Sequence, residues 1–319
     1  MTHPELAQAS TVPAWTPRAS RVALLQTGVV AALLVVAYWT PIRQIELRWR
    51  SDPNWSHGYL VPVFCLYFLW SRWDVLSRVM VRPSYLGALI LTGSLGLFFA
   101  GSWWLRMTYP QTVSIVGAIF GTVLLMGGWA VIRLVWFPIV FLLFAIPVPY
   151  EQWVALTRPL QELSCSAAAL IMPLLLPGLH TDAQSVVIDC LYTFKNAQGE
   201  LDFRRVPLNV EEACSGLRLL MTFLALGTAM AWLDERPAWQ RVLMVLSCLP
   251  IAMFCNFIRV TVTGLLTVTG NETLASGTPH MLLGIAMVGL AFGLFALFGN
   301  VLRHLFVEDT GDSGNAQTL

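Results

Sequence analysis

Residues 242–262 read VLMVLSCLPIAMFCNFIRVTV, and this run decides the fold class. Its length of about 20 residues is what an α-helix needs to cross the hydrocarbon core of a bilayer. It carries one charged residue, Arg259, near its end. Further runs of this kind lie on both sides, so the sequence predicts an integral membrane protein.

The composition agrees with this prediction, since 56% of the residues are apolar and 12% are charged. The 19 basic residues are scattered through short loops rather than gathered in a stripe, so we expect no nucleic-acid partner. The six cysteines form no C-x-x-C pair and have no accompanying histidine spacing that suits zinc, so we expect no metal and no cofactor.

Hydropathy predicts an all-α polytopic membrane protein with about eight transmembrane helices. The predicted spans are 22–40, 58–71, 85–105, 112–132, 134–149, 214–233, 242–262 and 281–302. A ninth apolar stretch, 160–176, is interrupted by Pro173 and begins beside Arg158 and Glu162. We therefore expect it to lie at the interface or to re-enter rather than to cross.

The positions of arginines predict the orientation of these spans. If the start of the sixth span is extracytoplasmic, seven arginines at span ends become cytoplasmic, as the positive-inside tendency requires. They are Arg72, Arg78, Arg82, Arg133, Arg236, Arg241 and Arg303. The expected domains are a disordered cytoplasmic leader (1–20), a single transmembrane domain (21–306) and a disordered cytoplasmic tail (307–319).

An extracytoplasmic insert, 177–213, interrupts the apolar pattern. Alternating residues at 185–189 and 202–206 flank the turn signal Asn196-Ala197-Gln198-Gly199. The pattern predicts a small β-hairpin that acts as a lid.

Three chemically active residues are predicted to meet at one membrane surface. Cys214 opens the sixth span, where the positive end of a helix dipole favours a thiolate. Arg259 comes near the outward end of the seventh span, where a fixed cation stabilises an oxyanion. His280 follows Pro279 at the start of the eighth span and suits proton transfer near neutral pH.

Five neighbours are candidates for substrate-binding or supporting roles: Arg218, Ser215, Gly216, Asn256 and His57. Arg218 shares a helical face with Cys214, and it is either a second cation or the partner of Glu211 or Glu212. His57 begins the second span on the same side, where an interfacial helix cap explains it nearly as well.

Each active residue also has a structural interpretation. Cys214 could be a packing residue or the disulfide partner of Cys190. Arg259 could extend its guanidinium to the lipid headgroups, and His280 could be a helix cap. Their joint placement on one side favours a catalytic site.

The motifs resemble the exosortase/archaeosortase family of polytopic transpeptidases. The resemblance rests on Glu212-Ala213-Cys214-Ser215-Gly216-Leu217-Arg218, on Asn256-x-x-Arg259 and on His280. It also takes in the segment from Trp55 to Pro62, Pro147-x-Pro149 and Pro159-Leu160-Gln161, and so covers nearly the whole hydrophobic region.

The resemblance implies Cys214 as nucleophile, Arg259 as cation and His280 as acid/base, acting through a thioacyl enzyme. It implies substrates that are exported, membrane-anchored proteins with a C-terminal sorting signal of the PEP-CTERM type: a Pro-Glu-Pro motif, a transmembrane helix and a basic end. It places the chain in the bacterial inner membrane with an extracytoplasmic active site. Some members of the family carry an additional soluble domain after the last span, and if such a partner is needed here we expect it to be a separate accessory protein.

Two interpretations from other classes stay open at this point. A transporter or flippase of lipid-linked glycan would also bury Arg and His in a polytopic bundle. A non-catalytic scaffold for exopolysaccharide export, with Cys214 bonded to Cys190, is the second.

Overall fold

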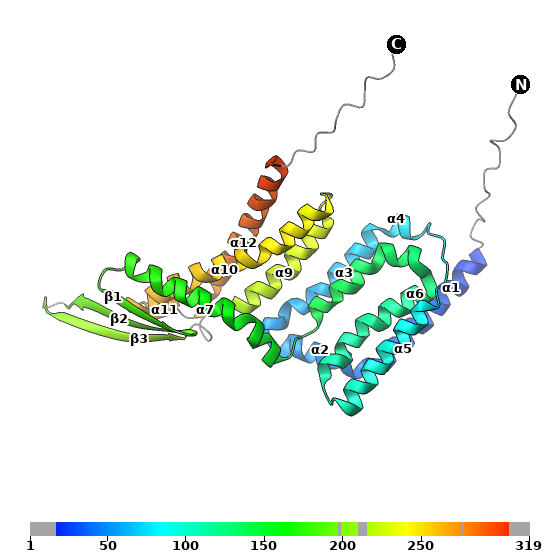
Figure 1. Ribbon diagram of the computed structural model, residues 1–319, viewed down its shortest axis with the longest axis horizontal. Coiled ribbons are helices and arrows are strands. Elements are labelled where there is room, and N and C mark those ends of the chain that lie inside the picture. The colour runs from blue at the N-terminus through cyan, green and yellow to red at the C-terminus, as the bar shows by residue number, and fades with distance from the viewer. Residues whose placement is uncertain (1–16, 197–198, 210–215, 276, 306–319) are drawn as a thin grey trace, which may run out of the picture. The chain divides into compact units, whose positions relative to one another are not determined.

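The computed structural model describes residues 17–196, 199–209, 216–275 and 277–305 (Figure 1). The chain divides into two compact units, each described by itself below. Unit 1 comprises Met1–Leu47 and Arg78–Trp136, and unit 2 comprises Arg48–Ser77 and Phe137–Leu319.

All the regular secondary structure in the described part of unit 1 is helical. Its elements are α1 (Pro17–Ala37), most of α2 (Trp39–Ser51), α5 (Leu86–Phe99), the π-helical turn η2 (Ala100–Trp104) and most of α6 (Thr108–Phe141). Tyr38 is buried, and its ring centroid lies 5.1 Å from that of Phe98. Its hydroxyl oxygen accepts a 3.3 Å hydrogen bond from Ser114 Oγ. This contact ties the junction of α1 and α2 to α5 and α6.

Gly128 breaks α6. Its φ of 75° and ψ of −173° are not helical, and a Cβ at this position would collide with the carbonyl oxygen of Arg82. Glycine alone meets both demands without strain. The two spans predicted at 112–132 and 134–149 therefore belong to one long helix that is interrupted near their predicted boundary.

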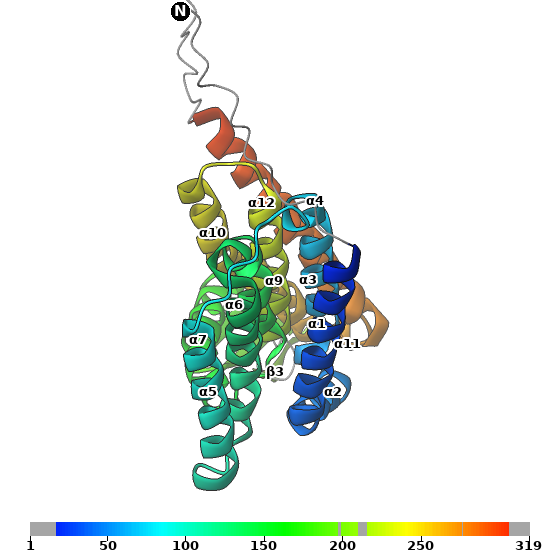
Figure 2. The same ribbon diagram turned by 90° about the vertical axis from the view of Figure 1, so that its right-hand side faces the viewer.

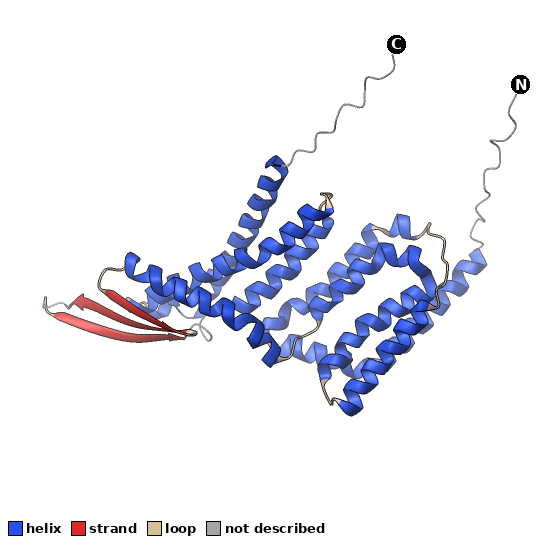
Figure 3. Ribbon diagram, in the orientation of Figure 1, coloured by secondary structure: helices blue, strands red, loops and turns tan. Residues whose placement is uncertain are grey.

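Unit 2 contains the other elements. Its helical elements are η1 (Pro53–Tyr59), α3 (Leu60–Ser71), α4 (Trp73–Leu76), η3 (Leu142–Ala145), α7 (Tyr150–Leu175), α9 (Gly216–Leu233), α10 (Ala238–Val268), α11 (Glu272–Ala275) and α12 (Gly277–Leu305). Its strands are β1 (Leu179–Gln184), β2 (Val187–Lys195) and β3 (Leu201–Asn209), drawn in red in Figure 3.

The predicted hairpin is part of a three-stranded antiparallel sheet in the order β1-β2-β3. Cys190 of β2 lies opposite Thr181 of β1 and Val206 of β3. The turn signal at 196–199 does fall between β2 and β3, but 185–189 is not a strand in itself, because Ser185 has a φ of 57° in the turn before β2. Strand β1 was not predicted, because its residues Leu-His-Thr-Asp-Ala-Gln lack regular alternation of apolar side chains.

The inner face of the sheet packs on two helices. Buried residues of α7, β1, β2 and α10 form one cluster, which we call the sheet core: Cys165, Ala168, Ala169, Met172, Leu179, Ile188, Cys190, Val260 and Val268. Thr181 Oγ1 donates a 2.6 Å hydrogen bond to the carbonyl of Ala169, which fixes β1 on α7.

The stretch 160–176 is the second half of α7, a helix that contains both Pro159 and Pro173. Before it, Ile146 is extended and Pro149 caps the helix, so the Pro147-x-Pro149 segment ends the preceding helical run, as proline chemistry requires. By length and composition α7 is not among the candidate spans.

Among the described residues, four helices are long and apolar enough to cross a membrane: Leu86–Trp104, Thr108–Ala145, Ala238–Val268 and Met281–Leu305. A fifth is obtained if the pair Leu25–Ala37 and Trp39–Ser51, bent by 68°, is one span. The predicted number of about eight is not confirmed. The difference arises because the described helices within the predicted spans 58–71 and 214–233 are short, and because α6 merges two others.

Candidate active site

Three helices of unit 2 share one core. Together α9, α10 and α12 enclose what we call the bundle core: Leu219, Phe223, Ala231, Met244, Cys248, Ala252, Cys255, Met287, Ala291, Phe295 and Leu302. Figures 1 and 2 both show α9 beside α10, which follows from their connection of only four residues, 234–237.

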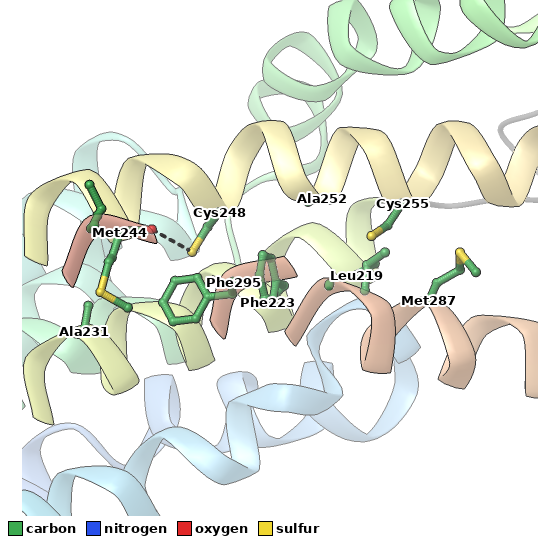
Figure 4. Packing of buried hydrophobic residues seen from close by; sticks show 11 residues of the cluster. Leu219, Phe223, Ala231, Met244, Cys248, Ala252, Cys255, Met287 and Phe295 are labelled. Carbon is green, nitrogen blue, oxygen red and sulfur yellow. Dashed lines mark hydrogen bonds between the residues drawn. The ribbon is translucent and has the colours of Figure 1, made fainter. Parts of the chain in front are cut away.

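The bundle core shows which helix ends lie together. In Figure 4, Leu219 of α9, Cys255 of α10 and Met287 of α12 gather at one end of the cluster, while Ala231 and Met244 lie at the other. At that other end, Met244 Cε is 3.4 Å from the Cβ position of Gly299 in α12. Thus α9 and α12 begin at the end where α10 approaches its own C-terminus.

This arrangement brings candidate residues to one level. Along the helix axes, Gly216 lies about 4.5 Å before Leu219, Arg259 about 6 Å beyond Cys255, and position 280 about 10 Å before Met287, all toward the same end. The sequence analysis expected two helix starts and one helix end at a common surface. The helix directions in unit 2 agree with that expectation.

Arg259 contacts the first part of α12. Its Nη2 and Cζ atoms lie 3.8 Å and 3.9 Å from the position of a Cβ on Gly284. Positions 280 and 284 are four residues apart and so lie on the same helical face. The guanidinium therefore faces the side of α12 on which residue 280 stands.

Asn256 lies one turn before Arg259 in α10. Only 6% of its side chain surface is exposed, and its Oδ1 has no hydrogen-bond partner within the described parts of the chain. A buried amide oxygen without a partner costs about 1–3 kcal/mol. Such a group is consistent with a site that orders a polar partner.

His57 lies in η1, which packs against α9. Its ring is 5% exposed and lies 5.7 Å from the ring of Trp55, which in turn is 5.4 Å from Trp153 of α7. Burial lowers the pKa of His57, and the nearby carbonyls of Phe144 and Asn54 oppose this to a smaller degree. Neither ring nitrogen has a partner of hydrogen-bond geometry within the described ranges, so the ring is held chiefly by packing.

Trp49 holds the segment that carries His57. Its Nε1 donates a 2.7 Å hydrogen bond to the carbonyl of Ala145, and its ring meets that of Tyr59 edge-on at 5.1 Å. The indole lies so close to Gly58 that any side chain there would collide with it. This explains why the tight segment Ser56-His57-Gly58 needs glycine at its third position.

The direction of α3 places His57 at the same end as Arg259. The guanidinium of Arg72, after the end of α3, lies over Trp232 near the end of α9, and Val61 and Cys65 of α3 share a buried cluster with Ala225 and Ala229 of α9. The two helices are therefore parallel, and η1 lies near the start of α9, two residues after Cys214.

Several predicted residues fall outside what the structure describes. Cys214 and Ser215 lie outside the described residues altogether. For Gly216, Arg218 and His280 the structure describes the helical backbone only. Their predicted roles stay predictions.

The five described cysteines are all free and buried: Cys65, Cys165, Cys190, Cys248 and Cys255. Burial raises the pKa of Cys190 to about 12 and that of Cys165 to about 11. A protonated, buried thiol is a poor nucleophile. Cys190 is free within the sheet core, and the alternative pairing of Cys190 with Cys214 involves a residue outside the described part of the chain.

Gly284 was not among the residues predicted from the sequence. It could have been recognised as a residue without a side chain on the same face of α12 as His280, which leaves room for a large group from a neighbouring helix. Trp49 was also missed, because nothing in the sequence links it to Ala145.

Comparison with known proteins identifies one matching family. The family model described as transmembrane exosortase matches residues 49–298. The matched range contains the sheet, α7, α9 and α10, and every candidate site residue lies within it. No curated protein and no solved structure matches the chain.

Proposed function

The chain belongs to the transmembrane exosortase family, and from this membership we propose that it is a membrane-embedded cysteine transpeptidase with Cys214 as nucleophile. The family is one of cysteine-type sorting transpeptidases, whose substrates are membrane proteins with sorting signals. The proposed substrates of this chain are exported proteins ending in a Pro-Glu-Pro-type motif, a transmembrane helix and a basic tail.

One observation carries the proposal: the guanidinium of Arg259 lies against Gly284, on the face of α12 that also bears position 280. A cation fixed between two helices costs no reorganisation when negative charge develops beside it. The start of α9, two residues after Cys214, lies at the same end of the bundle.

The burial of the other described cysteines supports the choice of nucleophile. None of those five presents an exposed thiol. Cys214, the remaining cysteine of the six, stands in the sequence two residues before the start of α9.

The proposed reaction has two halves. The Cys214 thiolate attacks the scissile carbonyl carbon, Arg259 stabilises the tetrahedral oxyanion, and His280 protonates the leaving amine as the C–N bond breaks. An acceptor nucleophile or water then attacks the thioester and releases the thiolate. Asn256 and His57 support this site from α10 and η1, and Arg218, Ser215 and Gly216 do so from the start of α9.

The site would lie at the extracytoplasmic side of the inner membrane, where an exported substrate anchored in the same bilayer presents its sorting motif. The sheet β1–β3, packed on α7 and α10, would stand beside it.

The test is co-expression with a reporter that ends in such a signal, followed by a gel shift for loss of its tail. Wild type should process the reporter, and Cys214→Ala, Arg259→Ala and His280→Ala should not. Cys248→Ala, a buried thiol of the bundle core, is the matched control and should process normally. Unchanged processing by Cys214→Ala would reject a thioacyl enzyme and favour the transporter interpretation.

A further inference from the structure

Two arginines converge on one tryptophan at the end of the bundle opposite Arg259. The Cζ atoms of Arg72, the C-cap residue of α3, and Arg241, in the first turn of α10, lie 5.5 Å and 5.6 Å from the ring centroid of Trp232. Trp232 itself lies in the last turn of α9. The ends of three helices thus contribute to one cluster. We call its two arginines, Arg72 and Arg241, the arginine pair.

Phe137 fixes the geometry of the arginine pair. Its ring stacks on Trp232 with centroids 4.1 Å apart and planes within 5° of parallel. One face of the indole is therefore covered by Phe137. The guanidinium groups of Arg72 and Arg241 each lie within 5.6 Å of the centroid of this indole, so two groups of the same charge border one ring.

Arg236, in the same region, has both an ion-pair partner and a hydrogen-bond partner for its guanidinium. It pairs with Asp234 at 2.9 Å and donates a 2.6 Å hydrogen bond to the carbonyl of Gly299. Within the described parts of the chain, no carboxylate lies within 4.0 Å of Arg72 or Arg241, and the buried Nε of Arg241 has no hydrogen-bond partner. Two neighbouring cations without a carboxylate favour an anion between them.

Exposed aromatic residues indicate the depth at which the arginine pair lies. Trp70 and Trp73 beside Arg72 are 73% and 59% exposed, and Trp239 beside Arg241 is 45% exposed. Tryptophans of this kind are enriched at the level of lipid headgroups. Anionic lipid headgroups are concentrated at that level.

We propose that Arg72 and Arg241, oriented by Trp232 and Phe137, bind the headgroup phosphate of an anionic phospholipid. Guanidinium groups suit phosphate because their planar fork donates two parallel hydrogen bonds. The site is independent of the proposed catalytic residues, because it lies at the other end of α9 and α10.

The experiment is native mass spectrometry of the full chain, purified in a non-ionic detergent and exposed to phosphatidylglycerol or phosphatidylcholine. Wild type should retain phosphatidylglycerol in preference to phosphatidylcholine. Each of Arg72→Gln and Arg241→Gln should weaken retention about fivefold, which corresponds to about 1 kcal/mol for each charge removed. Arg303→Gln, an exposed arginine in the last turn of α12, is the matched control and should bind as wild type does.

Conservative variants keep the test valid if the glutamine variants fold poorly. Arg72→Lys and Arg241→Lys keep the charge and lose the fork, so they should bind better than the glutamine variants and less well than wild type. Equal retention by wild type and the double glutamine variant would overturn the proposal. An equal loss in Arg303→Gln would overturn it too, since the effect would then be one of total charge.

Two further arms distinguish the source of the anion. Inorganic phosphate at the same concentration should not displace the lipid, and displacement would overturn the lipid assignment. Replacing the acids of the tail, Glu308→Gln, Asp309→Asn and Asp312→Asn together, should leave retention unchanged. If this tail variant bound the lipid and wild type did not, the lipid assignment would also be overturned, because the acidic tail would then occupy the site in wild type.

Discussion

The guanidinium of Arg259 in α10 packs against Gly284 in α12, with Nη2 3.8 Å from the position that a Cβ would take. This contact joins the N-terminal part of α12 to the C-terminal half of α10. The guanidinium fills the space into which a side chain longer than alanine at position 284 would extend.

Substitutions of Gly284 should therefore have graded effects. Gly284→Ala adds a methyl group at an ordinary van der Waals distance, and reporter processing should stay close to wild type. Gly284→Leu needs the space that the guanidinium fills, so processing should fall by about 100-fold as the cation is displaced from the oxyanion. Gly293→Leu, on the same helix with no atom within 4 Å, is the control. Normal processing by Gly284→Leu would show that the position of Arg259 does not matter.

Arg259 itself should be sensitive to geometry as well as charge. Arg259→Ala should lower the rate of processing by about 10²–10³, the effect of losing one preorganised donor to an oxyanion. Arg259→Lys keeps the charge without the planar fork and should give an intermediate rate. The measurement is single-turnover cleavage of the reporter in detergent. Equal rates for the lysine and alanine variants would indicate that charge alone does not support the reaction.

Thiol labelling should identify the reactive cysteine. Because the five described cysteines are buried and free, iodoacetamide should modify one thiol in the native protein and six after denaturation. Cys214→Ser should abolish the native labelling, and Cys190→Ser should leave it unchanged. Peptide mapping by mass spectrometry provides the readout, and rapid native labelling of Cys165 or Cys190 would contradict their burial.

His57 should make the fold sensitive to acid. Its pKa is lowered in the folded protein by burial, so the unfolded state takes up a proton first. Its contribution to stability is complete above the unfolded pKa of about 6.5 and is lost as the pH falls below it. The melting temperature of wild type should therefore drop between pH 7 and pH 5, and His57→Gln should reduce that drop. His180→Gln, an exposed position on β1, should not.

Gly128 should be intolerant of any side chain. Gly128→Ala places a Cβ against the carbonyl oxygen of Arg82 at a φ of 75°, so the free energy of unfolding should fall by roughly 1–3 kcal/mol. Gly93→Ala, in α5 with open space around it, should be neutral or slightly stabilising. Thermal melts in detergent would measure both, and equal stability of the two variants would mean that α6 is not strained there.

The sequence predicted the helical membrane class and the hairpin turn at 196–199, because long apolar runs and turn residues are local signals. It did not predict β1, since that strand is held by Thr181 bonding to α7 and by pairing with β2 rather than by its own pattern. Nor did it predict that Gly128 interrupts one long helix, because the cause is the distant carbonyl of Arg82.

The candidate site was accessible to prediction only in part. The order of the predicted spans and their alternating direction across the membrane were enough to predict that Arg259 lies at the level where α9 and α12 begin. The contact with Gly284 depends on how α10 and α12 are rotated about their axes, and hydropathy contains no such information. The environment of His57 likewise depends on Trp55 and Trp153, which are far apart in the chain.

The packing of the sheet limits how the protein could be shortened. Ile188 and Cys190 from β2 and Leu208 from β3 cover Met172 of α7 and Val260 of α10, next to Arg259. A truncated protein in which α7 is joined directly to α9 would leave apolar side chains of α10 uncovered. These side chains lie next to Arg259, whose guanidinium must be held in place. The segment 177–213 is therefore no removable module, and a smaller engineered enzyme would have to keep it.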